Sequence, residues 1–152
     1  MRYLTTAGLS RQGIDAPEVI IEDIWADVLG TADRNLLQRF ALEFELIVNP
    51  VYPMPGLGDI LSRLKEQGVT MGIISNAQFY TPILFSAYLG AGLEDLGFRK
   101  DLVVFSYEVG YGKPSSKAFL ATSRILGLKG IQPREVLFVG NDMLKDICPA
   151  RE

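Results

Sequence analysis

The segment from residue 135 to residue 147 constrains the fold more than any other part of this chain. Residues 136–139 are apolar without alternation, which is typical of a strand that is covered on both faces. Gly140 then permits a sharp turn. Three oxygen-bearing side chains follow: Asn141, Asp142 and Asp146. Because ligands of open α/β sheets bind beyond the carboxyl ends of the strands, the segment predicts a buried strand that ends at a polar site.

A metal ion is one explanation of this acidic end. Carboxylates that lie close together repel each other unless a cation lies between them, and Mg²⁺ accepts one or two carboxylates together with water and phosphate oxygens. A strand followed by a polar helix cap, without any ligand, explains the same residues equally well. This segment alone leaves both interpretations open.

Composition removes several classes of function. The formal net charge is −3, so charge does not favour binding to nucleic acid. Without a bilayer-spanning apolar run or a signal-peptide pattern, we expect no association with membranes. The single cysteine, Cys148, allows no internal disulfide and is typical of a reducing compartment, so we expect a cytoplasmic protein. Histidine is absent, which excludes Ser-His-Asp and Cys-His nucleophiles and an ordinary zinc site. Catalysis would need carboxylates, a lysine, hydroxyls or a hard metal ion.

Residues 1–50 predict a helical segment. Asp15 and Pro17 have the pattern of a helix entry, and apolar residues then recur at helical spacing until Gly30. A second amphipathic helix is expected to begin at Asp33. Three prolines within residues 50–55 exclude a continuing helix, so we place the boundary between two parts, 1–50 and 51–152, at this point.

The second part alternates short apolar runs with helical patterns. Strands are expected at 69–74, 102–105 and 136–139, and helices at 57–67 and 77–89. Strands that alternate with helices predict βαβ units and therefore a parallel sheet. The carboxyl ends of parallel strands meet at one edge of the sheet.

Polar residues follow the strand at 69–74. Ser75 and Asn76 offer a hydroxyl and backbone N–H groups, which suit an oxyanion or a phosphate group. A plain helix cap explains them as well, and for these two residues alone it is the more common case.

Lys113 precedes a proline after the strand at 102–105. Pro114 is expected to begin a helix, with Ser115 and Ser116 in its first turn. The Lys113 ammonium group would then lie near a helix N-terminus, where anions are favoured. The alternative is a solvated surface lysine. Taken together, the hydroxyl, the cation and the acids at one sheet edge predict a site that handles phosphoryl groups.

These segments resemble the haloacid dehalogenase (HAD) superfamily of hydrolases. Residues 72–76 resemble its second motif, an apolar strand that ends in Ser or Thr. Lys113 with Pro114 resembles the third motif, and residues 139–146 resemble the acidic fourth motif. The order and spacing of all three agree with the family. The resemblance implies a partial HAD-like, Rossmann-like α/β core of three layers with a parallel sheet at 51–152, and a partial helical cap at 1–50.

The first motif of the family, Asp-x-Asp on the first core strand, is not found in the sequence. Its leading Asp is the nucleophile of the family. We therefore expect the chain to begin inside the cap and to end before a later core strand, as an internal piece of a longer enzyme. The absent strand lies at the centre of the sheet in this fold, so we expect the isolated chain to be unstable or to self-associate through exposed sheet edges.

The resemblance also implies a function and a set of site residues. The longer parent would hydrolyse a small phosphorylated substrate through an aspartyl-phosphate intermediate, with Mg²⁺ as cofactor, whereas this chain alone would be inactive. The resemblance implies three roles: catalysis for Lys113 and Ser75; phosphate binding for Ser75, Asn76 and Lys113; and metal binding for Asp142, Asp146 and Asn141. The longer form of the fourth motif aligns Asn141 with the metal ligand and the shorter form aligns Asp142, which we favour because a carboxylate binds Mg²⁺ better than an amide.

Two other interpretations stay open. A non-catalytic HAD-like binding module, a pseudoenzyme, would retain the fold without the nucleophile. A receiver-like doubly wound module also places acids and a lysine at strand ends, although the helical N-terminal part disfavours it. Within the HAD superfamily, phosphatases, dehalogenases and phosphonate-cleaving enzymes share the core motifs seen here, so the substrate is open.

Overall fold

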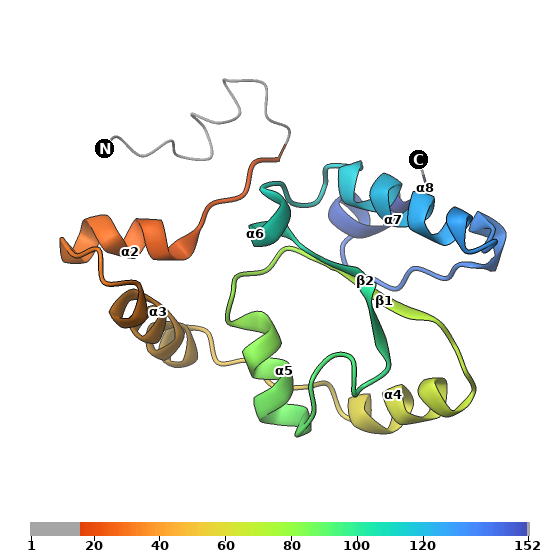
Figure 1. The fold of residues 1–152 in the computed structure, drawn as a ribbon, viewed down its shortest axis with the longest axis horizontal. Helices are drawn as coiled ribbons and strands as arrows, with labels where there is room; N and C mark the ends of the chain where they lie inside the picture. The colour runs from red at the N-terminus through yellow and green to blue at the C-terminus, as the bar shows by residue number, and fades with distance from the viewer. Residues whose placement is uncertain (1–15, 152) are drawn as a thin grey trace.

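The computed structural model describes residues 16–151, so Asp15 and the first part of the predicted cap lie outside the described residues. Figure 1 shows a sheet with helices on both sides, α4 (Leu57–Glu66) and α5 (Thr81–Leu89) on one and α7 (Lys117–Leu128) on the other. The predicted α/β, Rossmann-like arrangement is confirmed. None of the described helices is long and apolar enough to cross a membrane.

Within residues 16–151, two strands form the sheet. They are β1 (Met71–Ser75) and β2 (Phe98–Phe105), which pair in parallel with Ser75 opposite Phe105. A Cβ atom at Gly72 would lie 2.7 Å from the carbonyl oxygen of Leu102, so glycine permits the close approach of the two strands. Both strands were expected from the sequence, and β2 begins four residues before the predicted start at 102.

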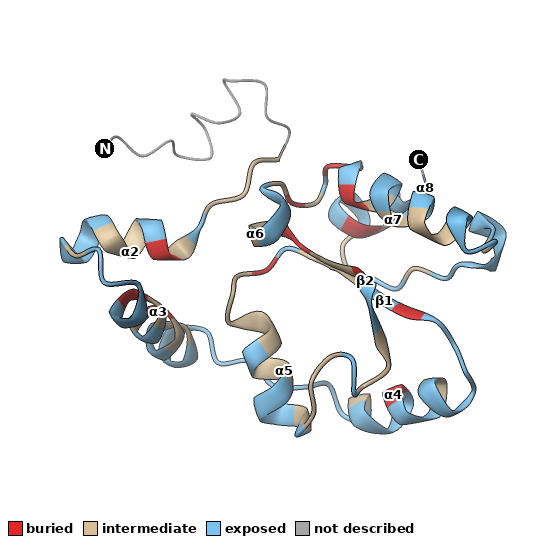
Figure 2. Ribbon diagram, in the orientation of Figure 1, coloured by how far each residue is buried: buried red, intermediate tan, exposed pale blue. Residues whose placement is uncertain are grey.

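The core lies between the sheet and its helices (Figure 2). Its buried apolar side chains come from both strands and from α4 and α7: Leu61, Met71, Leu102, Phe105 and Ala118. After α7 the chain forms the short helices η1 (Pro133–Glu135), η2 (Met143–Ile147) and α8 (Cys148–Arg151). This core is small, because many large apolar side chains elsewhere stay exposed.

The N-terminal helices form a pair of their own. α2 (Ile21–Leu29) and α3 (Arg34–Val48) pack through Trp25, whose ring lies 4.8 Å from both Phe40 and Phe44. Asp33 caps α3, because its side chain accepts hydrogen bonds from the backbone N–H groups of Asn35 and Leu36. The helix pair lies to one side of the sheet in Figure 1.

The strand predicted at residues 136–139 is wrong. The backbone is extended at Val136, but within residues 16–151 no strand pairs with this segment. The side chains of Leu137 and Val139 are 85% and 81% exposed. An apolar run shows that a segment could be buried, whereas a strand also needs a hydrogen-bonded neighbour, and no described segment supplies one.

The helix predicted after Lys113 is present, but its predicted start at Pro114 is wrong. α7 begins at Lys117, and the N–H of Ser115 donates to the carbonyl oxygen of Gly112 to close a turn around Lys113. Proline suits the early positions of a turn as well as the first position of a helix, so sequence alone does not separate the two. Between β2 and this turn the chain forms a short helix, α6 (Ser106–Val109).

The unpaired edge of β1 and the exposed run at 136–139 lead to a prediction about self-association. We expect the isolated chain to associate as its concentration rises, and we expect Leu137→Lys to weaken this association, because a charge on an exposed apolar segment opposes pairing. Sedimentation velocity over a concentration series measures the effect. Ile47→Lys is the matched control, since Ile47 on α3 is 80% exposed. A wild-type chain that stays monomeric at every concentration would contradict the prediction.

Candidate functional site

A buried ion pair lies at the carboxyl end of the sheet. The Nζ atom of Lys113 lies 2.5 Å from Oδ1 of Asp146, and the two side chains are only 15% and 5% exposed. Lys113 belongs to the turn after α6, and Asp146 to η2. The hydrogen bond from Lys113 holds the pKa of the Asp146 carboxyl below its usual range, although burial acts in the opposite direction.

The second oxygen of Asp146 is also occupied. Its Oδ2 accepts hydrogen bonds from the backbone N–H groups of Asp142 at 3.0 Å and Asn141 at 3.1 Å. A Cβ atom at Gly140 would collide with the side chain of Asp146, which explains the glycine before this loop. Asp146 therefore shapes the loop that contains it and also anchors the lysine.

Asn76 holds the backbone of Lys113. Oδ1 of Asn76 accepts from the N–H of Lys113 at 2.6 Å, and Nδ2 donates to the carbonyl oxygen of Lys113 at 2.9 Å. A Cβ atom at Gly112 would lie 2.8 Å from the same Oδ1, so this approach requires glycine. The Ser75 hydroxyl donates to the Asn76 carbonyl oxygen at 3.3 Å. The side chain of Asn76 thus positions the lysine turn, and its predicted contact with phosphate stays a prediction.

Asp142 and Asn141 differ in their surroundings. Oδ1 of Asp142 accepts from the N–H groups of Leu144 and Lys145, both at 2.9 Å, and so caps η2. Asn141 is exposed. The structure therefore brings Ser75, Asn76, Lys113 and Asp146 to one edge, with Asp142 beside them through its N–H bond to Asp146.

The donors for a metal ion are incomplete within residues 16–151. No three Cys, Asp or Glu side chains of this part of the chain are arranged to hold a metal ion. The carboxylate of Asp146 is bonded to Lys113 and to two N–H groups, whereas the hydrogen bonds of Asp142 involve Oδ1 and leave Oδ2. Mg²⁺ accepts one or two carboxylates with water and phosphate oxygens, so Asp142 fits as one ligand of such a shell.

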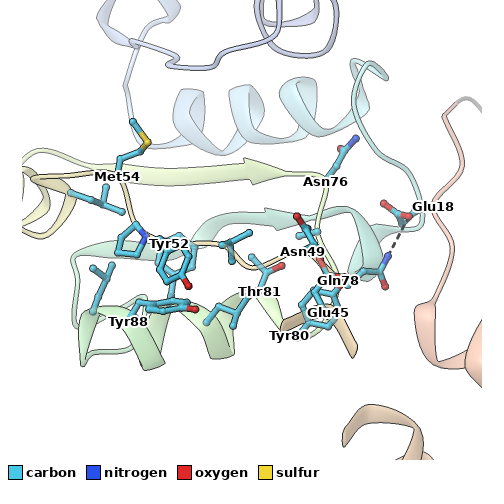
Figure 3. A pocket seen from close by; sticks show the side chains of 17 residues that line it. Glu18, Glu45, Asn49, Tyr52, Met54, Asn76, Gln78, Tyr80, Thr81 and Tyr88 are labelled. Carbon is cyan, nitrogen blue, oxygen red and sulfur yellow. Dashed lines mark hydrogen bonds between the residues drawn. The ribbon is translucent and has the colours of Figure 1, made fainter. Parts of the chain in front are cut away.

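Sequence reasoning missed a polar cluster beside this site. The Ser106 hydroxyl donates to Oε2 of Glu18 at 2.5 Å and accepts from the N–H of Ala77 at 2.9 Å. Gln78 donates to the carbonyl oxygen of Val19 and accepts from the N–H of Ile21. Figure 3 shows Gln78 bonded to Glu18 close to Asn76. Because Glu18 and Ser106 are 88 residues apart, no local pattern could have indicated the contact.

The Lys113–Asp146 pair predicts a pH-dependent contribution to stability. The folded pKa of Asp146 lies below the unfolded value of about 3.9, so the stabilisation is complete above about pH 4 and is lost as the pH falls through the folded pKa. We expect Asp146→Asn to lower the free energy of unfolding by about 3 kcal/mol at pH 7, because it leaves the Lys113 charge buried without a partner.

Urea unfolding at pH 7 and at pH 3 tests this expectation. The difference between wild type and Asp146→Asn should shrink at pH 3, because below about pH 4 the unfolded wild-type chain takes up a proton at Asp146 and is thereby favoured. Asp101→Asn is the control, because Asp101 pairs with Arg99 and Lys129 at an exposed position and should change stability less. If Asp146→Asn and Asp101→Asn lower the free energy of unfolding equally at pH 7, the burial of the Lys113–Asp146 pair does not contribute to stability.

Comparisons with known proteins agree with the geometry. A model of the haloacid dehalogenase-like hydrolase family matches residues 7–151. An uncharacterized hydrolase of Schizosaccharomyces pombe is 38% identical over 103 residues, which are 64% of this chain and 42% of that protein. A glyceraldehyde 3-phosphate phosphatase of Methanocaldococcus jannaschii is 28% identical over 132 residues, which are 86% of this chain and 54% of that protein. The chain thus spans about half the length of these relatives. It belongs to the family of haloacid dehalogenase-like hydrolases.

Proposed function

We propose that this chain forms the phosphate-binding part of a HAD-type enzyme that hydrolyses phosphate monoesters. The observation that carries the proposal is the buried Lys113–Asp146 pair, held beside Asn76 at the carboxyl end of the sheet. A cation kept ordered at a sheet edge suits a phosphate group better than it suits a neutral substrate. The similarity to a phosphatase supports the same reaction class.

Each site residue has a distinct proposed role. Lys113 has three N–H donors, so its bond to Asp146 leaves two that can neutralise charge on phosphoryl oxygens. The Ser75 hydroxyl would turn from the Asn76 carbonyl to a phosphoryl oxygen. Asn76 positions Lys113, and Asp146 orients its ammonium group. Bound at Asp142, with Asn141 nearby, Mg²⁺ would supply further positive charge against the transferred group.

The proposed chemistry has two steps. The carboxylate of an aspartate attacks phosphorus and displaces the alkoxide, which leaves as the alcohol after taking a proton. Water then cleaves the aspartyl phosphate, which regenerates the carboxylate and releases phosphate. The printed sequence contains no Asp-x-Asp pair, and the carboxylate of Asp146 is committed to Lys113. We therefore propose that this chain binds phosphate but does not turn substrate over without an added aspartate.

The remaining assignments follow from the same proposal. Residues up to 50 would act as a partial helical cap over the core at 51–152, because α2 and α3 pack mainly on each other. The single cysteine is in keeping with a cytoplasmic location. The absence of Asp-x-Asp also supports a second candidate, a non-catalytic module that binds phosphorylated compounds through Lys113.

Phosphate binding tests the proposed role of Lys113. Titration calorimetry with inorganic phosphate and Mg²⁺ should show binding to the wild-type chain, and Lys113→Met should weaken it about tenfold, because a charge-assisted contact is lost. Lys145→Met is the control, since Lys145 is an exposed lysine on η2. If Lys113→Met unfolds, the double variant with Asp146→Asn removes the unpaired acid and keeps the test valid. If phosphate binds to Lys113→Met and to the double variant as tightly as to the wild-type chain, the proposed role of Lys113 is refuted.

Turnover separates the missing nucleophile from the phosphate site. We expect the purified chain to release no phosphate from 4-nitrophenyl phosphate above the rate of a blank, with or without Mg²⁺, because the sequence contains no Asp-x-Asp pair. Release of 4-nitrophenol is followed by absorbance. The control for protein quality is phosphate binding in the same preparation. Mg²⁺-dependent hydrolysis that is lost in Lys113→Met would show that the chain carries its own nucleophile.

A further inference from the structure

A cavity of ≈590 Å³ lies between α5 and the segment that joins α3 to α4. Most of its wall is apolar or aromatic, and the main contributors are Tyr52, Met54, Leu57, Leu84, Phe85 and Tyr88. Its size is that of a site for a small organic molecule. Asn76, the residue that positions Lys113, also lines it, so one end of the cavity reaches a residue that contacts the candidate phosphate site.

The apolar part of the cavity faces solvent. Tyr52 and Met54 are each 76% exposed, and the ring of Tyr52 lies 5.9 Å from the ring of Tyr88. Packing of the core cannot account for side chains that remain this exposed. Two neighbouring rings with open faces suit an apolar or aromatic group of a ligand.

The polar part of the cavity gathers at the other end. Figure 3 shows Glu18, Glu45, Asn49, Gln78 and Tyr80 near Asn76, away from Tyr52 and Tyr88. Oε1 of Glu45 accepts from Nδ2 of Asn49 at 2.6 Å. Burial and then the charge of Glu45 raise the pKa of the Tyr80 hydroxyl to about 12, so this group stays protonated at neutral pH.

Charge at the polar end selects the kind of ligand group. Among residues 16–151, the charged residues that line the cavity are the acids Glu18 and Glu45, and no lysine or arginine of this part of the chain lines it. Glu18 accepts from Ser106, Gln78 and the N–H of Val19, whereas Glu45 accepts from Asn49 and interacts with Tyr80, so Glu45 has more capacity left for a ligand donor. An ammonium or hydroxyl group fits here, whereas a second anion is repelled.

We propose that this cavity binds the organic part of a phosphate monoester that carries a hydrogen-bond donor near its phosphate and an apolar, ring-sized tail. The phosphate lies toward Asn76 and Lys113, the donor contacts Glu45, and the tail lies against Tyr52 and Tyr88. The inference rests on the proposed function, because the phosphate site sets the orientation of the ligand. It names a substrate class that the family alone does not specify.

Binding of compounds without phosphate tests the cavity by itself. The probe for titration calorimetry with the full chain is phenylalaninol, which has an amine, a hydroxyl and a phenyl ring. Serinol lacks the ring, 3-phenylpropanol lacks the amine, and phenylacetate carries an anion. We expect phenylalaninol to bind most tightly, 3-phenylpropanol less tightly, and serinol and phenylacetate at least about tenfold more weakly than phenylalaninol.

Two variants with matched controls locate the contacts. Tyr52→Ala should lower the affinity for phenylalaninol about tenfold. Leu128→Ala should leave this affinity unchanged, because Leu128 is 90% exposed and lies outside the cavity. Glu45→Gln retains an acceptor for Asn49 but removes the charge. It should therefore lower the affinity for phenylalaninol about threefold and leave the affinity for 3-phenylpropanol unchanged. Glu43→Gln on the same helix is its control. Thermal unfolding of each variant shows that the fold is retained.

The outcomes separate this inference from the proposed function. If neither phenylalaninol nor 3-phenylpropanol binds, or if Tyr52→Ala leaves the binding of phenylalaninol intact, the cavity assignment is overturned whatever Lys113 does. Phenylalaninol phosphate should bind more tightly than phenylalaninol, and Lys113→Met should remove only that gain. If the gain is absent while phenylalaninol still depends on Tyr52, the cavity assignment stands for the apolar group and the phosphate role of Lys113 fails.

Discussion

The buried ion pair between Lys113 and Asp146 is the contact on which the site depends. Residues 136–139 form no ladder with the sheet, so hydrogen bonds of a strand do not hold the C-terminal segment in place. The ion pair does so instead, helped by the edge contact between the rings of Phe119 and Phe138 at 5.0 Å. One interaction therefore anchors η2 to the core and keeps an ammonium group at the end of the sheet.

A second network links the helix pair to the same edge. Glu18 and Gln78 bind the segment before α2 to the loop after β1, and Ser106 at the end of β2 completes the contact. Asn76 lies in that loop and holds the backbone of Lys113. The position of the N-terminal segment and the position of the lysine are therefore coupled through a few short hydrogen bonds. The cavity beside Asn76 lies where these parts meet.

The exposed apolar side chains have a common physical origin. Val139, Leu137 and Leu128 are 81–90% exposed, although their pattern is that of buried positions. A two-stranded sheet offers too little surface to cover them, and no strand of the described part of the chain pairs with the second edge of β1. At these side chains a further strand could pair with the sheet or a further helix could pack against it. The cavity differs from them, because its apolar wall ends at a polar cluster and at the candidate phosphate site.

The sequence by itself determined the class of the fold and the family, and it predicted the residues of the candidate site. Apolar runs of strand length between helical patterns indicated β1, β2 and most helices, and the order of Ser75, Lys113 and the acidic loop indicated the family. Such features are local, so a single pass along the chain detects them.

Only the tertiary structure decided which of these segments found partners. It left 136–139 without a ladder, placed Pro114 in a turn, and committed Asp146 to Lys113 and Asp142 to a helix cap. It also assembled Glu18, Gln78 and Ser106 from distant parts of the chain. Pairing, burial and charge neutralisation depend on neighbours in space, and a pattern along the chain does not contain them.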